Sequence, residues 1–198
     1  MTTKPFSQAC ENNKHPILEQ LRKLFTDKRT ILEIGSGTGQ HACFFAEQLP
    51  QILWQPSDRP ENLPGIQLWL NEAGLTNILP PIRLDVTDEF WPVELIEGLF
   101  TANTLHIMAW SEIETLFGRL KPLLVHNALC CIYGPFNYGG TYTSDSNAKF
   151  DQWLHERNPL SGIRDMEAVL SLAHIADMEL FDDFTMPSNN RLLVLRKN

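Results

Sequence analysis

The sequence has few of the features that mark secreted, metal-binding or membrane proteins. It contains only four cysteines, none of them in a CxxC pair or in a His/Cys cluster. This favours reduced core cysteines and predicts neither a disulfide framework nor a bound metal. No stretch approaches the roughly 20 apolar residues that span a membrane. The polar start of the chain, from Met1 to Pro5, lacks the apolar core of a signal peptide, so we expect a soluble, cytoplasmic protein.

Positive charge is also scarce. The chain has 16 basic and 24 acidic residues, a net charge of −8, and no Lys/Arg run longer than Arg196-Lys197. Because nucleic-acid binding depends largely on neutralising phosphates, we expect no nucleic-acid partner. A small-molecule substrate is the expected partner, and no membrane surface is expected. The oligomeric state does not follow from the sequence.

What the sequence does contain is an ordinary globular composition. Hydrophobic residues make up 43% and charged residues 20%, which argues against wholesale disorder. A length of 198 residues suits one domain with a sizeable core. We find no linker, repeat or low-complexity segment, so a single domain is expected over residues 1–198.

Apolar runs bounded by turn residues alternate with amphipathic stretches along most of the chain. This pattern predicts strands at residues 30–34, 52–55, 78–84, 99–104 and 128–133, with helices starting near Pro16 and over 42–49, 61–73, 113–123 and 146–157. Pro80-Pro81 indicate that the third strand lies at a sheet edge or begins only at Ile82. Segments 178–184 and 192–196 have too few residues between them for a helix, so they predict an antiparallel hairpin. The expected fold is α/β, a doubly wound, mostly parallel seven-stranded sheet with a C-terminal antiparallel hairpin. It is typical of the Rossmann-like methyltransferases.

The strongest local signal is a glycine-rich turn between the first predicted strand and the next helix. It reads Glu33-Ile34-Gly35-Ser36-Gly37-Thr38-Gly39. Glycines there let the backbone turn sharply and approach a ligand closely. The dinucleotide fingerprint GxGxxG needs glycine at position 40, where Gln40 stands. The GxGxG spacing instead suits S-adenosylmethionine, which has no pyrophosphate; a purely structural tight turn is the alternative.

Polar residues follow the next three predicted strands. Asp58, after the second strand, is placed to accept hydrogen bonds from two ribose hydroxyls, although alone it would be an ordinary exposed aspartate. Asp85 and Val86, after the third, can contact an adenine ring, or Asp85 can serve only as a cap or turn residue. Asn103 and His106, after the fourth, lie where the reactive methyl group is expected.

These residues resemble those of the class I methyltransferases and, more narrowly, of the methyltransferase-like 26 family, long labelled a domain of unknown function. The matching segments include Asn12-Asn13-Lys14-His15-Pro16, Gly39-Gln40-His41, Trp54-Gln55-Pro56-Ser57-Asp58, Tyr133-Gly134-Pro135-Phe136-Asn137 and Met186-Pro187-Ser188-Asn189-Asn190. The resemblance spans nearly the whole chain and implies the methyltransferase fold with S-adenosylmethionine as cofactor. The expected cofactor-binding residues are Asn13, Glu33, Gly35, Ser36, Gly37, Gly39, Gln40, His41, Asp58, Arg59, Asp85, Val86, Asn103 and His106.

Candidates for catalysis are few, because methyl transfer from a sulfonium depends mainly on alignment. His106 is the first candidate for a general base, since imidazole titrates near ~6.5; a histidine that only satisfies the fold or touches cofactor is the alternative. Tyr133 and Tyr142 can orient or deprotonate a substrate, or simply pack. Neither the Asn/Asp-Pro-Pro-aromatic motif of N-methylating enzymes nor the carboxylates of a magnesium-dependent catechol-type enzyme follows the fourth strand.

The segment 134–147, rich in glycine and aromatic residues, is expected to form the substrate wall and a mobile lid, with a packed surface loop as the alternative. Arg164-Asp165 is interpreted as a structural ion pair at a helix start, with a substrate carboxylate as the alternative partner of Arg164. Three functions stay open: a small-molecule methyltransferase, a protein methyltransferase, and a non-catalytic module that binds S-adenosylmethionine.

Overall fold

One mixed sheet organises the computed structural model, which describes residues 3–198. Its strands are β1 Thr30–Ile34, β2 Leu53–Asp58, β3 Ile82–Arg83, β4 Ile96–Ala102, β5 Leu124–Gly134, β8 Met178–Met186 and β9 Asn190–Lys197. Within the described part of the chain these seven strands are ordered β3-β2-β1-β4-β5-β9-β8. The first five strands pair in parallel, and β9 pairs antiparallel to both β5 and β8. The predicted fold, including the terminal hairpin, is confirmed.

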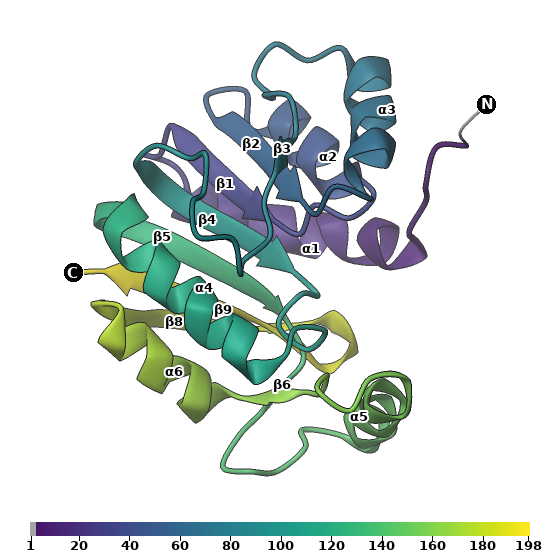
Figure 1. The fold of residues 1–198 in the computed structure, drawn as a ribbon, viewed down its shortest axis with the longest axis vertical. Coiled ribbons are helices and arrows are strands. Elements are labelled where there is room, and N and C mark those ends of the chain that lie inside the picture. The colour runs from purple at the N-terminus through teal and green to yellow at the C-terminus, as the bar shows by residue number, and fades with distance from the viewer. Residues whose placement is uncertain (1–2) are drawn as a thin grey trace.

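Helices cover both faces of this sheet (Figure 1). They are α1 Gln8–Leu24, α2 Gln40–Gln48, α3 Leu63–Ala73, α4 Trp110–Leu123, α5 Asp145–Arg157 and α6 Met166–Ile175. The apolar sides of α1 and α2 pack with Phe25, Trp54 and Phe100 in one core cluster. Those of α4 and α6 pack on the other face. Because parallel strands are buried from both sides, the central strands carry almost uninterrupted apolar runs.

Several boundaries differ from the sequence prediction for identifiable reasons. The fourth strand ends at Ala102 because Asn103 takes a positive φ of 58° and begins a turn. The fifth strand begins at Leu124, four residues before the predicted start, because exposed His126 and Asn127 interrupt the apolar pattern there. The helix start expected at Arg164-Asp165 is that of α6, which packs against α4 and β8. The third strand begins at Ile82, as Pro80-Pro81 had indicated.

The carboxyl ends of the parallel strands meet on one side of the molecule. In Figure 1 the arrowheads of β1, β2 and β4 point toward the side where α5 and the N-terminal segment lie. A small second sheet, β6 Phe136–Asn137 paired with β7 Arg164–Asp165, joins the end of β5 to α6 on that side. Among residues 3–198, no helix is long and apolar enough to cross a membrane.

Candidate functional site

A cavity of about 1410 Å³ opens at the carboxyl ends of β1, β2 and β4. The chain leaves β1 toward β2 on one side and returns to β4 on the other. This creates the crevice where ligands bind in open α/β sheets. Ten of the predicted site residues line the cavity: Gly35, Ser36, Gly37, His41, Asp58, Arg59, Asp85, Val86, Asn103 and His106. The structure therefore brings most of the residues predicted from the sequence together at one cavity.

The glycine-rich turn is held against the end of β2. The amides of Gly35 and Ser36 both donate to the Ser57 carbonyl at 3.0 Å. Gly35 has a φ of +72°, and a Cβ there would collide with the Thr104 side chain. Gly37 has a φ of +58° and would carry a Cβ into open space beside the cavity. The turn thus needs glycine for both conformation and close approach.

The carboxylate of Asp58 accepts several hydrogen bonds at the cavity, and only 7% of the residue is exposed. Its Oδ2 accepts from the Gly37 amide at 2.6 Å, and its Oδ1 accepts from the Arg59 amide at 2.7 Å and from Asn62 Nδ2 at 2.8 Å. A carboxylate has about four acceptor positions. One therefore remains for a ligand, and a second becomes free if Asn62 turns away.

Asp85 is bonded as a turn residue, and its role toward an adenine ring stays a prediction. Its Oδ1 accepts from the amide of Thr87 at 2.9 Å and from its hydroxyl at 2.7 Å, and these bonds lower the pKa of the carboxyl. It is a turn residue, and it also lines the cavity beside buried Val86. Val86 can contact the flat face of a ligand ring there.

His106 follows β4 and has only 6% of its surface exposed, at the cavity. Burial, together with the nearby Arg164 guanidinium, lowers the pKa of its imidazole to about 4. Within residues 3–198 no group hydrogen-bonds its ring nitrogens. The imidazole is therefore neutral at physiological pH and free to bind a ligand hydroxyl.

His41 lies on the first turn of α2, and its Nε2 is 2.7 Å from Asn13 Oδ1 on α1. Burial lowers the pKa of this imidazole to about 4 as well, so it stays neutral. The Tyr133 hydroxyl lies near the side chains of Asn13 and Asn190, and burial raises its pKa. Neither Asn13 nor Tyr133 lines the cavity, and Asn13 orients His41 from behind it.

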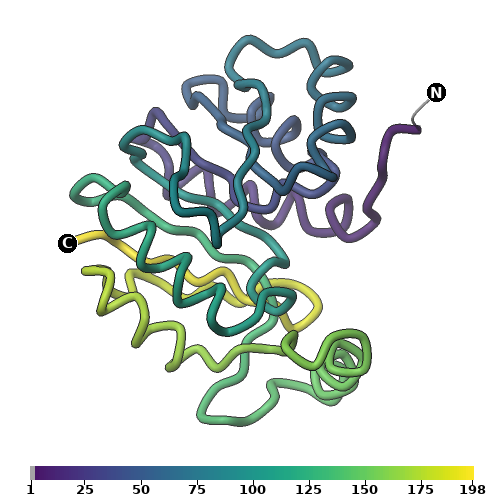
Figure 2. The backbone as a smooth tube through the Cα atoms, in the orientation of Figure 1, coloured from purple at the N-terminus to yellow at the C-terminus, as the bar shows by residue number. Residues whose placement is uncertain are grey.

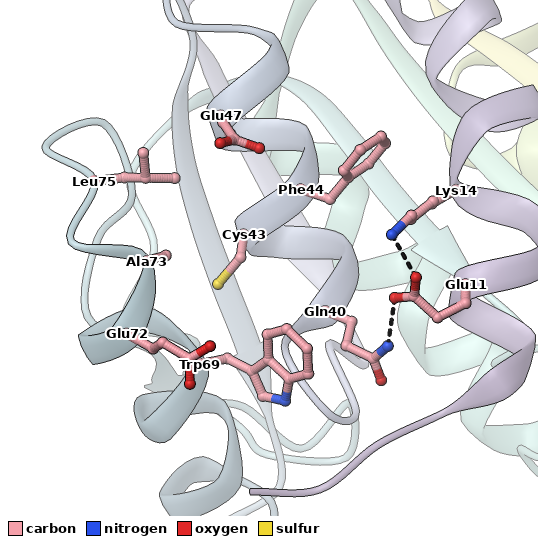
Figure 3. A pocket seen from close by; sticks show the side chains of 10 residues that line it. All are labelled: Glu11, Lys14, Gln40, Cys43, Phe44, Glu47, Trp69, Glu72, Ala73 and Leu75. Atoms are coloured by element: carbon pink, nitrogen blue, oxygen red, sulfur yellow. Dashed lines mark hydrogen bonds and ion pairs between the residues drawn. The ribbon is translucent and has the colours of Figure 1, made fainter.

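Three further residues of the predicted cofactor set do not line the cavity. Glu33 lies beneath the turn, where its Oε2 accepts from Ser36 Oγ and Trp54 Nε1, both at 3.0 Å, and burial raises its pKa to about 7. Gly39 faces α3, where a Cβ would press on Ile66. Gln40 turns toward α1 and donates to Glu11 Oε1 at 2.8 Å (Figure 3). Glu33 and Gly39 shape the turn from outside the cavity.

The interpretation of segment 134–147 as the substrate wall is wrong. Phe136 is buried in the core, and the Tyr138 hydroxyl donates to Asp183 at 2.7 Å. Tyr142, a predicted catalytic residue, donates to Asp151 Oδ2 at 2.6 Å and does not line the cavity. These contacts fix the segment against β8 and α5, so it is a packed surface loop.

One side of the cavity is formed instead by α5, through Phe150, Trp153, Leu154 and Arg157. The spacing i, i+3, i+4, i+7 places these four residues on one helix face, a signal that the sequence did carry. The expected ion pair between Arg164 and Asp165 is also wrong. The Arg164 guanidinium donates instead to the carbonyls of Leu105, Met108 and Leu160. It thereby fixes the loop after β4.

The N-terminal segment is the part of the site that the sequence analysis missed. Thr3, Pro5 and Ser7 line the cavity, and in Figure 2 this segment runs from the N-terminal side of the molecule down to α1. Trp69 Nε1 donates to the Pro5 carbonyl at 2.7 Å, and Lys4 Nζ lies 3.7 Å from the centre of the Trp69 ring. Partners more than 60 residues apart leave no local pattern in the sequence.

A second, smaller cavity of about 240 Å³ lies between α1, α2 and α3 (Figure 3). Gln40, Cys43 and Trp69 line it beside the Lys14–Glu11 ion pair. Burial raises the pKa of the Cys43 thiol to about 12, so the thiol stays protonated and unreactive. In the described part of the chain, no group of three or more His, Cys, Asp or Glu residues is arranged to hold a metal ion.

Solved structures share this architecture. A putative O-methyltransferase from Nostoc punctiforme PCC 73102 matches with a TM-score of 0.83 at 15% identity, over 95% of this chain and 56% of that one. An O-methyltransferase family 2 protein from Planctomyces limnophilus DSM 3776, in complex with apigenin, matches with a TM-score of 0.81 at 16% identity. The match covers 96% of this chain and 58% of that one. PigF with SAH matches with a TM-score of 0.78 at 16% identity, and the match covers 92% of this chain and 55% of that one.

This chain spans little more than half the length of each of those proteins, and identities this low show the fold alone. The fold is that of class I methyltransferases. A protein family described as "Protein of unknown function (DUF938)" matches residues 4–197. Since this match covers nearly the whole chain, the protein belongs to the DUF938 family.

Proposed function

We propose that this protein binds S-adenosylmethionine and transfers its methyl group to a hydroxyl oxygen of a small molecule. The observation that carries the proposal is the arrangement at the crevice between β1 and β4. There the glycine turn is open to the cavity at Gly37, and the neighbouring carboxylate of Asp58 can still accept a hydrogen bond from a ligand. The resemblance to the methyltransferase-like 26 family supports the same cofactor. So do the neighbours in the fold, of which one contains SAH and another apigenin.

The residues present fit this cofactor. Gly37 leaves room for a ligand against the backbone, Asp58 can accept from a ribose hydroxyl, and Val86 can cover an adenine ring. Pockets for one drug-sized ligand measure about 300–1,000 Å³. A cavity of about 1410 Å³ therefore has room for a second small molecule beside the cofactor.

Methyl transfer needs few catalytic groups from the protein. When bound, S-adenosylmethionine supplies the methyl group, whose bond to sulfur breaks as a bond to the acceptor oxygen forms. The protein's part is to align the acceptor and remove its proton. Neutral His106 can accept that proton through a ring nitrogen and pass it to water at the cavity mouth. The depressed pKa keeps the imidazole unprotonated at neutral pH, though it also makes it a weak base.

The test is a labelling experiment with radioactive S-adenosylmethionine and small-molecule extracts from cells. We expect label in a low-mass product formed by the wild-type protein, and strongly reduced label with His106→Gln. Label appearing only in protein would favour the protein methyltransferase. Cofactor binding without any labelled product would favour the non-catalytic module.

A further inference from the structure

The half of the cavity away from the glycine turn has a distinct chemical character. His106 and Phe150 contact edge to face with ring centres 5.3 Å apart. Phe150 and Trp153 are stacked at 5.7 Å with an interplanar angle of 19°. The Arg157 guanidinium lies 4.5 Å from the centre of the Trp153 ring. All four residues line the cavity. They form a continuous row that runs from the candidate base to a cation.

The middle of this row is an aromatic surface. Trp153 remains 46% exposed, and Ile107, from the loop after β4, is 56% exposed. Large apolar side chains left open around a cavity mark a surface that a ligand covers. Flat aromatic faces favour planar, ring-bearing ligands, since stacked rings gain more than their buried area alone gives.

The far end of the row carries an uncompensated positive charge. Among residues 3–198, Arg157 makes no ion pair and no side-chain hydrogen bond. The other arginine that lines the cavity, Arg59, pairs with Glu61 at 3.4 Å. The carboxylate of Glu112, which also lines the cavity, accepts from the Ala109 amide at 2.6 Å and caps α4. The guanidinium lies over the Trp153 ring, and its N–H groups, which donate to no side chain or carbonyl among residues 3–198, can bind the two oxygens of a carboxylate.

We propose that the methyl acceptor is a planar aromatic compound bearing a carboxylate in addition to its hydroxyl group. Its ring lies against Phe150 and Trp153, its carboxylate binds Arg157, and its hydroxyl faces His106. This inference rests on the proposed function for the role of the hydroxyl. The predicted recognition of an aromatic acid by Arg157 and Trp153 can be measured without turnover.

Binding calorimetry with 4-hydroxycinnamic and 3,4-dihydroxycinnamic acids, each compared with its uncharged methyl ester, tests this directly. Each titration is made with and without SAH. A hydrogen-bonded ion pair predicts that the acids bind about tenfold to a hundredfold more tightly than the esters. Arg157→Gln is expected to abolish the difference by weakening the acids only. Trp153→Ala weakens acids and esters alike. The matched control is Arg119→Gln on α4, an arginine outside the cavity, which leaves both unchanged.

The outcomes separate this inference from the proposed function. Esters that bind the wild type as tightly as the acids, or an acid preference that survives Arg157→Gln, would overturn the inference and leave methyl transfer standing. Failure of both acids and esters to bind while SAH binds would also overturn it. If SAH itself does not bind, the proposed function fails. An acid preference that depends on Arg157, measured without SAH, would still support the recognition of an aromatic acid.

Discussion

Replacing Asp58 with alanine removes the carboxylate on which the cofactor assignment depends most. In the folded protein this group already accepts from Gly37, Arg59 and Asn62, and one acceptor position remains for a ribose hydroxyl. A hydrogen bond to a charged acceptor contributes about 1.5–3 kcal/mol. We therefore expect the affinity for S-adenosylmethionine to fall roughly tenfold to more than a hundredfold.

The variant should also unfold at a lower temperature, because the amides of Gly37 and Arg59 lose their partner. These groups face a wet cavity, so water replaces part of the loss and the protein should remain folded. Isothermal titration calorimetry measures the affinity, and circular dichroism at the same temperature shows that the fold persists.

Asn62→Ala is the matched control. It keeps the charge of Asp58 and frees one acceptor position, so we expect cofactor affinity to stay within about threefold of wild type or to rise. Equal affinities for the wild-type and Asp58→Ala proteins would refute the reasoning, and Asp58 would then only hold the turn. A loss with Asn62→Ala as large as with Asp58→Ala would show that local order, not the charge, governs binding.

Three further predictions concern other parts of the site. His106→Gln should lower turnover by about 10²- to 10⁴-fold with little change in cofactor affinity, and equal single-turnover rates in variant and wild type would count against His106 as base. Burial depresses the pKa of His106 to about 4, below the value of ~6.5 in the unfolded chain. The neutral buried imidazole therefore adds to the free energy of unfolding above pH ~6.5, and up to about 3 kcal/mol of this is lost as the pH falls toward 4. The free energies of unfolding of wild type and His106→Gln, measured in denaturant, should therefore converge as pH falls over this window. A constant difference between them would contradict the depressed pKa of His106. Trp69→Phe removes the donor to Pro5 while keeping an aromatic face for Lys4, and should speed cofactor dissociation several-fold in stopped-flow measurements; an unchanged rate would show that the N-terminal segment is not a functional wall.

Most of the cavity residues beside the glycine turn could be predicted from the sequence because they follow strand ends. Once the parallel strands are recognised, Gly37, Asp58 and Asp85 must meet at one edge of the sheet. What the sequence could not give is which residues touch the cavity and which support it. Glu33 adjoins the turn in the chain, yet its carboxylate points beneath it to Trp54.

The side of the cavity formed by α5 was predicted less well for a different reason. Glycine and aromatic residues in segment 134–147 suggest a mobile wall, but Tyr138 and Asp183 fix it through a contact between residues 45 positions apart. Such pairings depend on tertiary packing that local patterns do not encode. The aromatic face of α5 was visible as a helical spacing, whereas its direction toward the cavity follows only from the fold.

The central claim is most directly tested by calorimetric titration of the wild-type protein with S-adenosylmethionine, SAH, NAD and NADP under identical conditions. We expect S-adenosylmethionine and SAH to bind at a stoichiometry of one per chain, and NAD and NADP to give no heat of binding. A ligand at 100 times its dissociation constant should also stabilise the fold by about 2.7 kcal/mol. Binding of NAD or NADP with equal affinity, or no binding of S-adenosylmethionine and SAH, would contradict it.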